Sequence, residues 1–327
     1  MQWPFSSTTK AQAPVPVAAE GFVGIYETPK SLSIAYGVSN GSVVTIKAQF
    51  FQSFSLGDTG IKEVALQRFI KSNHLEGVSC AYVLGAGEYS LYLVESPAVP
   101  IQERSQAVSW LIRDLVNFPI EEAVIDSFEL PFSRARDNLN MLYAVVMRKS
   151  QMADIESFIN GSGLVLTHID IPELALKNIV NLDPKYKEGC AFIQLYAQGG
   201  RLILLQNNSI CMIRSFDLSL DDLVSPTGAT ALESLCLEIQ RSFDYVNSMF
   251  RKNISNTVVL AKTSVDISMI QEAVKNTLGF EVNIVDFSEK TKTEKPLSDE
   301  ERIECLCAIG TLLKDQDLEN ETTDKPL

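Results

Sequence analysis

The fold of this chain is most constrained by one order of strands and helices that occurs twice in the sequence. In each copy, three segments of alternating apolar and polar residues precede a segment with one apolar helical face, and a further apolar strand follows. The first copy predicts strands at 21–27, 32–38 and 42–51, a helix over 58–73 and a strand at 78–84. The second copy predicts strands at 190–197, 201–206 and 209–216, a helix that opens near residue 230, a strand at 257–261, a helix over 267–278 and a strand at 281–287. Two lobes of the same topology are therefore expected, each large enough to bury its own core.

The segment between the two copies has a periodicity of its own. It predicts a helix over 104–118, strands at 124–130 and 141–147, a helix over 150–160 and a strand at 164–170. The pair Asn160-Gly161 is a helix stop signal, because glycine adopts the left-handed conformation without strain. Pro172 then favours the start of a new helix. We expect the segment to form a small α/β subdomain inserted into the first lobe.

Three antiparallel strands, a helix and a further strand, occurring twice, form the ribonuclease-H-like duplication on which actin, sugar kinases and Hsp70 chaperones are built. The predicted fold class is therefore α/β, an actin-like (ribonuclease-H-like) duplicated fold of two lobes with a small inserted α/β subdomain. The expected parts are a flexible N-terminal arm at 1–18, a first actin-like subdomain at 19–86 and 171–187, the inserted α/β subdomain at 87–170, a second actin-like subdomain at 188–290, and a C-terminal helix with an acidic disordered tail at 291–327.

The charge balance excludes some partners. Lys and Arg number 28 against 41 Asp and Glu, which gives a net charge of -13. Such a chain repels both phosphate backbones and an anionic lipid surface, so nucleic acid is not an expected partner. No run of about 18 apolar residues and no basic, then apolar, N-terminal leader occurs, so we expect a cytoplasmic protein without a membrane span.

The six cysteines lie mostly within apolar runs, which predicts reduced core residues. Cys305 and Cys307 form a C-x-C pair, but only His74 and His168 could complete a metal site, and neither is at ligand spacing. No metal site is expected.

The expected nucleotide chemistry of an actin-like ATPase is missing from the sequence. Such an enzyme needs glycine turns that expose backbone amides to phosphate and carboxylates that position Mg²⁺ and water. In the first lobe, Tyr26 stands in the place of the acid; in the second lobe, Gln194 and Tyr196 stand in the places of the acid and the glycine. Where a Gly-Gly turn should follow the strand at 257–261, the chain reads Ala261-Lys262-Thr263. We therefore expect no catalytic, cofactor-binding or metal-binding residue, and no enzyme activity.

Several stretches together carry a resemblance to a known family. They are 88–100 (EYSLYLVESPAVP), 114–122 (DLVNFPIEE), 124–131 (VIDSFELP), 163–175 (GLVLTHIDIPELA) and 237–245 (LEIQRSFDY). Their order and spacing resemble the PilM and MshI family of type IV pilus assembly proteins, and MshI most closely. The resemblance covers nearly the whole chain.

The resemblance implies a non-catalytic scaffold or adaptor in the assembly platform of a mannose-sensitive haemagglutinin (MSHA) type pilus. It also implies a position at the cytoplasmic face of the inner membrane, where the protein would bind the N-terminal cytoplasmic segment of a PilN/MshJ-like inner-membrane protein. Other platform components, including the assembly ATPase, would be further partners.

For the partner site, the resemblance carries over only a region, the groove between the first lobe and its inserted subdomain. An acidic rim with aromatic anchors would suit a short basic and apolar peptide. The candidate residues are Glu95, Trp110, Asp114, Phe118, Glu121 and Asp126. The alternative that Trp110 and Phe118 are core residues stays open, as do two other functions: a nucleotide-binding actin-like ATPase of pilus assembly, and a type II secretion adaptor of the same fold.

Overall fold

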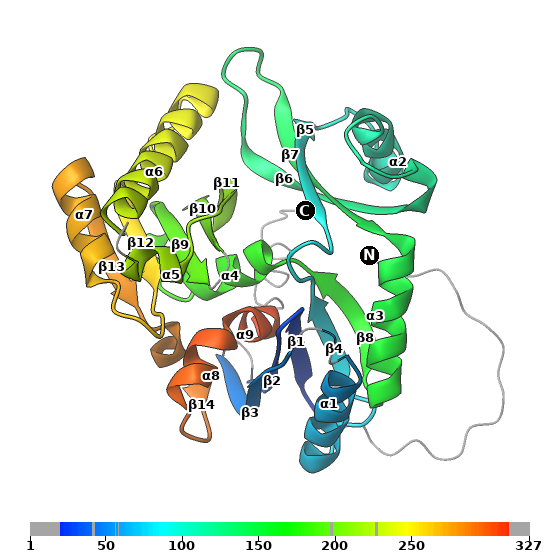
Figure 1. Ribbon diagram of the computed structural model, residues 1–327. Helices are drawn as coiled ribbons and strands as arrows, with labels where there is room; N and C mark the ends of the chain where they lie inside the picture. The colour runs from blue at the N-terminus through cyan, green and yellow to red at the C-terminus, as the bar shows by residue number, and fades with distance from the viewer. Residues whose placement is uncertain are drawn as a thin grey trace.

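The computed structural model describes residues 20–40, 43–55, 57, 59–196, 199–225 and 228–313, which form three β-sheets with helices around them (Figure 1). The strand orders are β14-β3-β2-β1-β4-β8, β11-β10-β9-β12-β13 and β5-β7-β6. The expected N-terminal arm and acidic tail lie outside the described residues, apart from the part of the C-terminal region that ends at Leu313.

The first sheet begins with two antiparallel hairpins and continues with parallel strands. Its strands are β1 (Phe22–Thr28), β2 (Ser31–Asn40), β3 (Val43–Ser53), β4 (Ser79–Val83), β8 (Val165–Asp170) and the short β14 (Lys292–Thr293). Helices α1 (Thr59–Asn73) and α3 (Lys149–Ser162) pack against it, and the buried residues between them form one core with the sheet.

The second sheet has the same topology. Its strands are β9 (Cys190–Tyr196), β10 (Gly199–Gln206), β11 (Ser209–Phe216), β12 (Thr257–Ala261) and β13 (Glu281–Val285), with helices α5 (Leu220–Val224), α6 (Gly228–Phe250) and α7 (Ser268–Leu278) beside them. Asn207 and Asn208 join β10 to β11 with φ of 51° and 62°, the conformation of a hairpin turn that asparagine tolerates. Numbered along the chain within each lobe, the strands lie side by side in the order third, second, first, fourth and fifth, and β14 adds to the outer edge of the first sheet. The predicted duplication is confirmed.

Strand β8 corrects one expectation. The sequence predicts residues 164–170 as part of the inserted subdomain, but β8 pairs in parallel with β4 at the edge of the first sheet. The reason is that α3 covers the first sheet and returns the chain to it, as a helical crossover does between parallel strands. Apolar alternation predicts a strand but not the sheet that the strand joins.

The inserted sheet contains β5 (Ser90–Glu95), β6 (Ala123–Ser133) and β7 (Asn140–Arg148), with helix α2 (Ile101–Ile112) on it. Helix α2 begins after Pro100 and ends at Ile112, where a turn follows, so it is shorter than the predicted 104–118. Helix α3 continues past the predicted stop at Asn160-Gly161 and ends at Ser162, where Gly163 (φ 90°) caps it. Short 3₁₀ segments occupy Ile120–Glu122, Pro184–Tyr186 and Phe287–Lys290.

Two helices lie between the lobes: α4 (Pro172–Val180) and α9 (Leu306–Leu312), the latter preceded by α8 (Asp299–Glu304). The single predicted C-terminal helix is thus two helices that meet at Cys305. Every residue of α9 is buried, in a core that takes residues from both large sheets and from α4. The C-terminal helix is therefore part of the core between the lobes.

Helix α9 approaches its neighbours through two glycines. A Cβ atom on Gly24 of β1 would lie 2.0 Å from the carbonyl oxygen of Ala308, and one on Gly310 would lie 2.1 Å from that of Ala175 in α4. Asn178 of α4 also donates a buried hydrogen bond to the carbonyl of Gly310, at 3.0 Å. Backbones at this distance leave no room for any side chain.

No helix in the described part of the chain is both long and apolar enough to cross a membrane. All six cysteines are buried thiols, and burial raises the pKa of Cys80, Cys190, Cys211 and Cys307 to about 12. Among the described residues, no group of three or more His, Cys, Asp or Glu side chains is placed to hold a metal ion.

We predict that Gly310→Ala destabilises the protein by about 2 kcal/mol or more, because the added methyl group must push α9 away from α4. The matched control is Gly161→Ala, which adds the same group in α3 with no atom within 4 Å. Alanine is favoured over glycine in a helix, so the control should be neutral or slightly stabilising. Urea denaturation of both variants measures the difference; equal stabilities would contradict the close packing of α9.

Candidate functional site

The contact between the lobes is built on a buried ion pair. Arg201 of β10 and Glu173 of α4 are 4% and 2% exposed, and the Arg201 Nε atom lies 3.7 Å from Glu173 Oε1. The Tyr89 hydroxyl donates to the same carboxylate, 2.7 Å from Oε2 and 2.9 Å from Oε1. The Arg201 guanidinium lies 5.5 Å from the ring centre of Tyr196, and it interacts electrostatically with Tyr26. We call these five residues the interlobe cluster.

The charges of the interlobe cluster depend on one another. Burial by itself would lower the pKa of Arg201, but Glu173, Tyr26 and Tyr89 outweigh burial and hold that pKa above its ordinary value. Burial, reinforced by Glu173, raises the pKa of Tyr89, and burial also raises that of Tyr26. Arg201 thus remains a cation inside the protein, and the tyrosines remain neutral hydrogen-bonding groups.

The interlobe cluster contains two of the residues at which the sequence predicts the loss of nucleotide-binding turns. Tyr26 and Tyr196 stand where an acid and a glycine were expected, and the structure places both beside Arg201. At the β1–β2 turn, the Lys62 ammonium donates to the carbonyl of Thr28, at 2.5 Å, and pairs with Glu27, at 3.0 Å. The protein's own side chains therefore satisfy backbone and charge at these turns.

A separate cavity of about 380 Å³ lies between the inserted sheet and the first lobe. In Figure 1 the inserted sheet lies above α3 and β8, and residues of all three line the cavity. Apolar side chains make much of its wall: Val124, Phe128, Val145, Met147, Met152, Leu166, Ile169 and Leu174. We call this cavity the groove.

The groove has two properties of a peptide site. Its residues come in part from β6 and β8, which are edge strands of their sheets and can each accept an additional strand. Its lining contains the acids Asp126, Glu156 and Asp170 and no Lys or Arg. The groove thus suits an extended segment that is apolar and basic.

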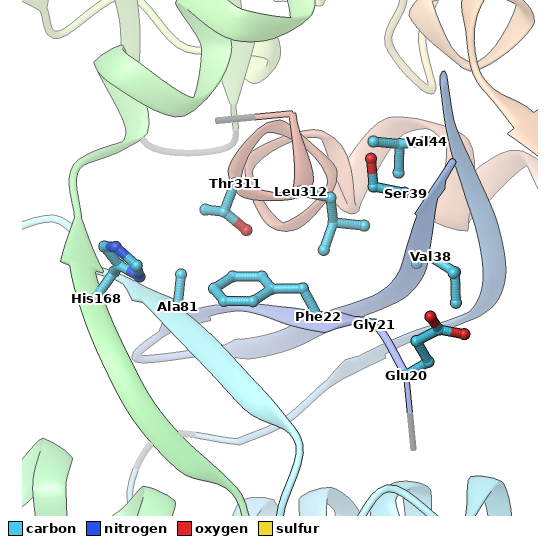
Figure 2. A pocket seen from close by; sticks show the side chains of 11 residues that line it. Glu20, Gly21, Phe22, Val38, Ser39, Val44, Ala81, His168, Thr311 and Leu312 are labelled. Carbon is cyan, nitrogen blue, oxygen red and sulfur yellow. The ribbon is translucent and has the colours of Figure 1, made fainter. Parts of the chain in front are cut away.

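Figure 2 shows a smaller cavity, of about 200 Å³, between the first sheet and α9. Phe22 of β1 and Ala81 of β4 line one side, and Thr311 and Leu312 of α9 line the other. His168 belongs to both cavities. Glu20 is the only acid in this lining, so the smaller cavity has fewer groups to orient a charged ligand.

One of the six predicted partner-binding residues lies in the groove, and five lie outside it. Asp126 lines the groove, and Glu95, Trp110, Asp114, Phe118 and Glu121 do not. Trp110 lies on α2 and is 67% exposed, which excludes the core alternative for this residue. Phe118 packs partly buried against the core of the inserted subdomain, with Arg148 4.0 Å above its ring.

The other three predicted residues also lie outside the groove. Glu95 ends β5 and pairs with Arg134, 2.5 Å away. Glu121 lies in the exposed 3₁₀ segment before β6, and Asp114 is exposed in the turn after α2.

Sequence reasoning missed most of the groove residues, although a signal for them was present. The stretch 163–175, which contributed to the family resemblance, supplies all the β8 residues of the groove as well as Ile171 and Leu174. Met147 and Met152 had no distinctive signal, because methionine in a strand or helix ordinarily indicates core.

These features define a class: the chain has an actin-like fold with two duplicated lobes and an inserted subdomain beside a groove. No family model and no curated protein matches the chain. Solved structures do match it. A PilM-PilN type IV pilus biogenesis complex superposes with a TM-score of 0.72 at 16% identity, over 90% of this chain and 98% of that one.

Two further structures have the same fold. The cytoplasmic domain of EpsL, an inner membrane component of the type II secretion system of Vibrio cholerae, gives a TM-score of 0.50 at 12% identity, over 92% of this chain and 95% of that one. A Bacteroides thetaiotaomicron protein of unknown function with an actin-like ATPase fold gives 0.50 at 8% identity, over 86% and 96%.

We predict that Arg201→Ala lowers the free energy of unfolding by about 3 to 5 kcal/mol, because it leaves Glu173 buried without its counter-charge. The double variant Arg201→Met with Glu173→Gln removes both charges and should lose much less. Chemical denaturation followed by circular dichroism compares the two. A single variant that is no less stable than the double variant would show that the ion pair is not energetically coupled.

Proposed function

We propose that this protein is a non-catalytic adaptor of a type IV pilus assembly platform, which holds the short cytoplasmic segment of a PilN/MshJ-like inner-membrane protein in the groove. The observation that carries the proposal is an apolar groove with an acidic lining between two sheet edges. The partner would keep the adaptor at the cytoplasmic face of the inner membrane.

Charge complementarity supports this partner. Single-span inner-membrane proteins concentrate Lys and Arg on the cytoplasmic side of the span. A chain of net charge -13 whose groove is lined by Asp126, Glu156 and Asp170 attracts such a segment. The same charge disfavours direct binding of the adaptor to anionic lipid, so the partner's own membrane span would provide the anchor.

The edge strands support an extended binding mode. A segment that adds to β6 or β8 gains backbone hydrogen bonds, and its alternate side chains point to one face. Met147, Met152 and Leu174 offer apolar surface there, and methionine adapts to side chains of different shape. Affinity would therefore come from backbone pairing and specificity from a few apolar anchors.

The fold is consistent with the proposal, because a PilM-PilN complex shares it over almost the full length of both chains. The assignment to an MSHA-type platform, and contact with an assembly ATPase, extend the proposal by the sequence resemblance alone. A type II secretion adaptor is the second candidate, favoured by the likeness to the cytoplasmic domain of EpsL.

A nucleotide-dependent function is disfavoured by the interlobe cluster. A nucleotide between the lobes needs backbone amides and carboxylates that are free to bind phosphate and metal. At the three positions where the sequence predicts the loss of these groups, the chain instead has Tyr26, Tyr196 and Lys262. Lys262 pairs with Asp286 at 3.5 Å.

We predict that a labelled synthetic peptide of the PilN-like protein's cytoplasmic N-terminal segment binds the purified protein, and that Asp126→Lys weakens binding by about tenfold. The loss follows from placing a cation in a groove that attracts a basic segment. Fluorescence anisotropy at low and high salt measures the affinity, and the difference between wild type and variant should shrink as salt rises.

Glu121→Lys is the matched control, because it makes the same charge change at an exposed position of the inserted subdomain outside the groove. It should bind nearly as the wild type does. Equal weakening by both variants would contradict the groove as the site, and absence of binding by a folded wild-type protein would overturn the proposed function. Tighter binding of an equivalent segment from a type II secretion protein would favour the second candidate.

We predict that Mg-ATP at millimolar concentration leaves the melting temperature unchanged. A ligand at 100 times its Kd stabilises the folded state by about 2.7 kcal/mol, which thermal denaturation detects readily. A rise of several degrees that requires both Mg²⁺ and ATP would show that the lobes bind nucleotide despite the interlobe cluster.

A further inference from the structure

Three parts of the molecule meet at the Glu173 carboxylate. Glu173 lies in the first turn of α4, next to Leu174, which lines the groove. Tyr89, which donates to it, directly precedes β5 of the inserted sheet. Arg201, which pairs with it, belongs to β10 of the second lobe. One buried side chain thus contacts the inserted subdomain and the second lobe from a position behind the groove.

The chain segment around Tyr89 is the connection that carries the inserted sheet. It leaves the first sheet after β4, and the Leu84 amide donates to the carbonyl of Asp170 at the end of β8, at 2.9 Å. Leu84 and Asp170 both line the groove. This hydrogen bond continues the pairing of β4 with β8, so the chain leaves the first sheet toward Tyr89 and β5 directly beside the end of β8.

The inserted sheet also contacts the second lobe directly. The Ile213 amide of β11 donates to the Tyr143 hydroxyl, at 3.1 Å, and the Ala135 amide donates to the carbonyl of Met249 at the end of α6, at 2.8 Å. The rings of Phe132 and Phe250 pack with their centres 6.3 Å apart. The sheet that forms one wall of the groove is thus fixed to the second lobe, while β8, the other wall, belongs to the first.

We propose that Glu173 is the positioning residue of the groove, and that the spacing of its two walls depends on the second lobe through Arg201. This inference rests on the proposed function, because it concerns the same groove. Partner binding and the contact between the lobes are then linked reciprocally: a bound segment stabilises the interlobe cluster, and a weakened cluster lowers affinity. None of Glu173, Tyr89 and Arg201 lines the groove, so their effect on binding must pass through the position of its walls.

Tyr89→Phe tests the inference most cleanly, since it removes one hydroxyl and leaves the ion pair and the ring in place. With the labelled peptide of the PilN-like protein, we expect about a fivefold loss of affinity, less than the full value of one hydrogen bond to a charged group, because Tyr89 acts on the groove only through the position of its walls. Glu173→Gln combined with Arg201→Met should lose more, because it also removes the ion pair that joins α4 to the second lobe. Hydrogen exchange should become faster in β6 and β8 in both variants.

Two controls separate positioning from stability. Tyr36→Phe removes a hydroxyl of the first lobe, which donates to the carbonyl of Glu20 at 2.7 Å, outside both the groove and the interlobe cluster. Val274→Ala destabilises the second lobe from its core, at a fully buried residue of α7. Both should keep wild-type affinity at temperatures where they remain folded.

The inference is overturned if wild type binds the peptide and Tyr89→Phe and the double variant bind equally well. It is also overturned if Val274→Ala loses as much affinity as they do, because the effect would then follow stability alone. A folded wild type that fails to bind the peptide refutes the proposed function, and the inference with it.

Discussion

The close approach of α9 to its neighbours is the constraint on which the arrangement of the two lobes depends. Gly24 lets the helix lie against β1, and Gly310 lets it lie against α4, where side chains would keep the backbones apart. The core around α9 takes residues from both large sheets, so a helix near the end of the chain joins elements that begin more than two hundred residues earlier. Removing apolar surface from water over this contact stabilises both lobes together.

The interlobe cluster gives the same contact its polar component. A buried ion pair adds little net stability, because desolvation offsets much of the attraction, but losing one partner is costly. Glu173 and Arg201 therefore favour arrangements of the lobes in which the two charges remain paired, and the Tyr89 hydroxyl adds direction to that restriction. A bound nucleotide with its metal would provide comparable bridging charges in an actin-like ATPase. In this chain the bridging charges belong to the protein itself.

The groove lies where three structural units meet, which accounts for its character. Strands β6 and β8 are edge strands of two different sheets, so their outer edges are available on either side of an apolar floor. The floor comes from α3 and α4 as well as from the strands, and its acids lie on three of these elements. A flexible segment that binds there would lose its conformational entropy only on binding, which favours a reversible contact.

Local patterns in the sequence determined the strands, the helices and their duplicated order, because alternation and helical periodicity report which face of each element is buried. They also drew attention to Tyr26 and Tyr196, at positions where an actin-like ATPase is expected to carry an acid and a glycine. Only the tertiary structure decided that β8 joins the first sheet, that Trp110 is exposed while Phe118 packs inward, and that Asp126 alone of the six candidate residues lines the groove. It also decided that Tyr89, Glu173 and Arg201 meet. The physical reason is that these contacts join residues far apart in the chain, and periodicity within one segment carries no information about which other segment covers it.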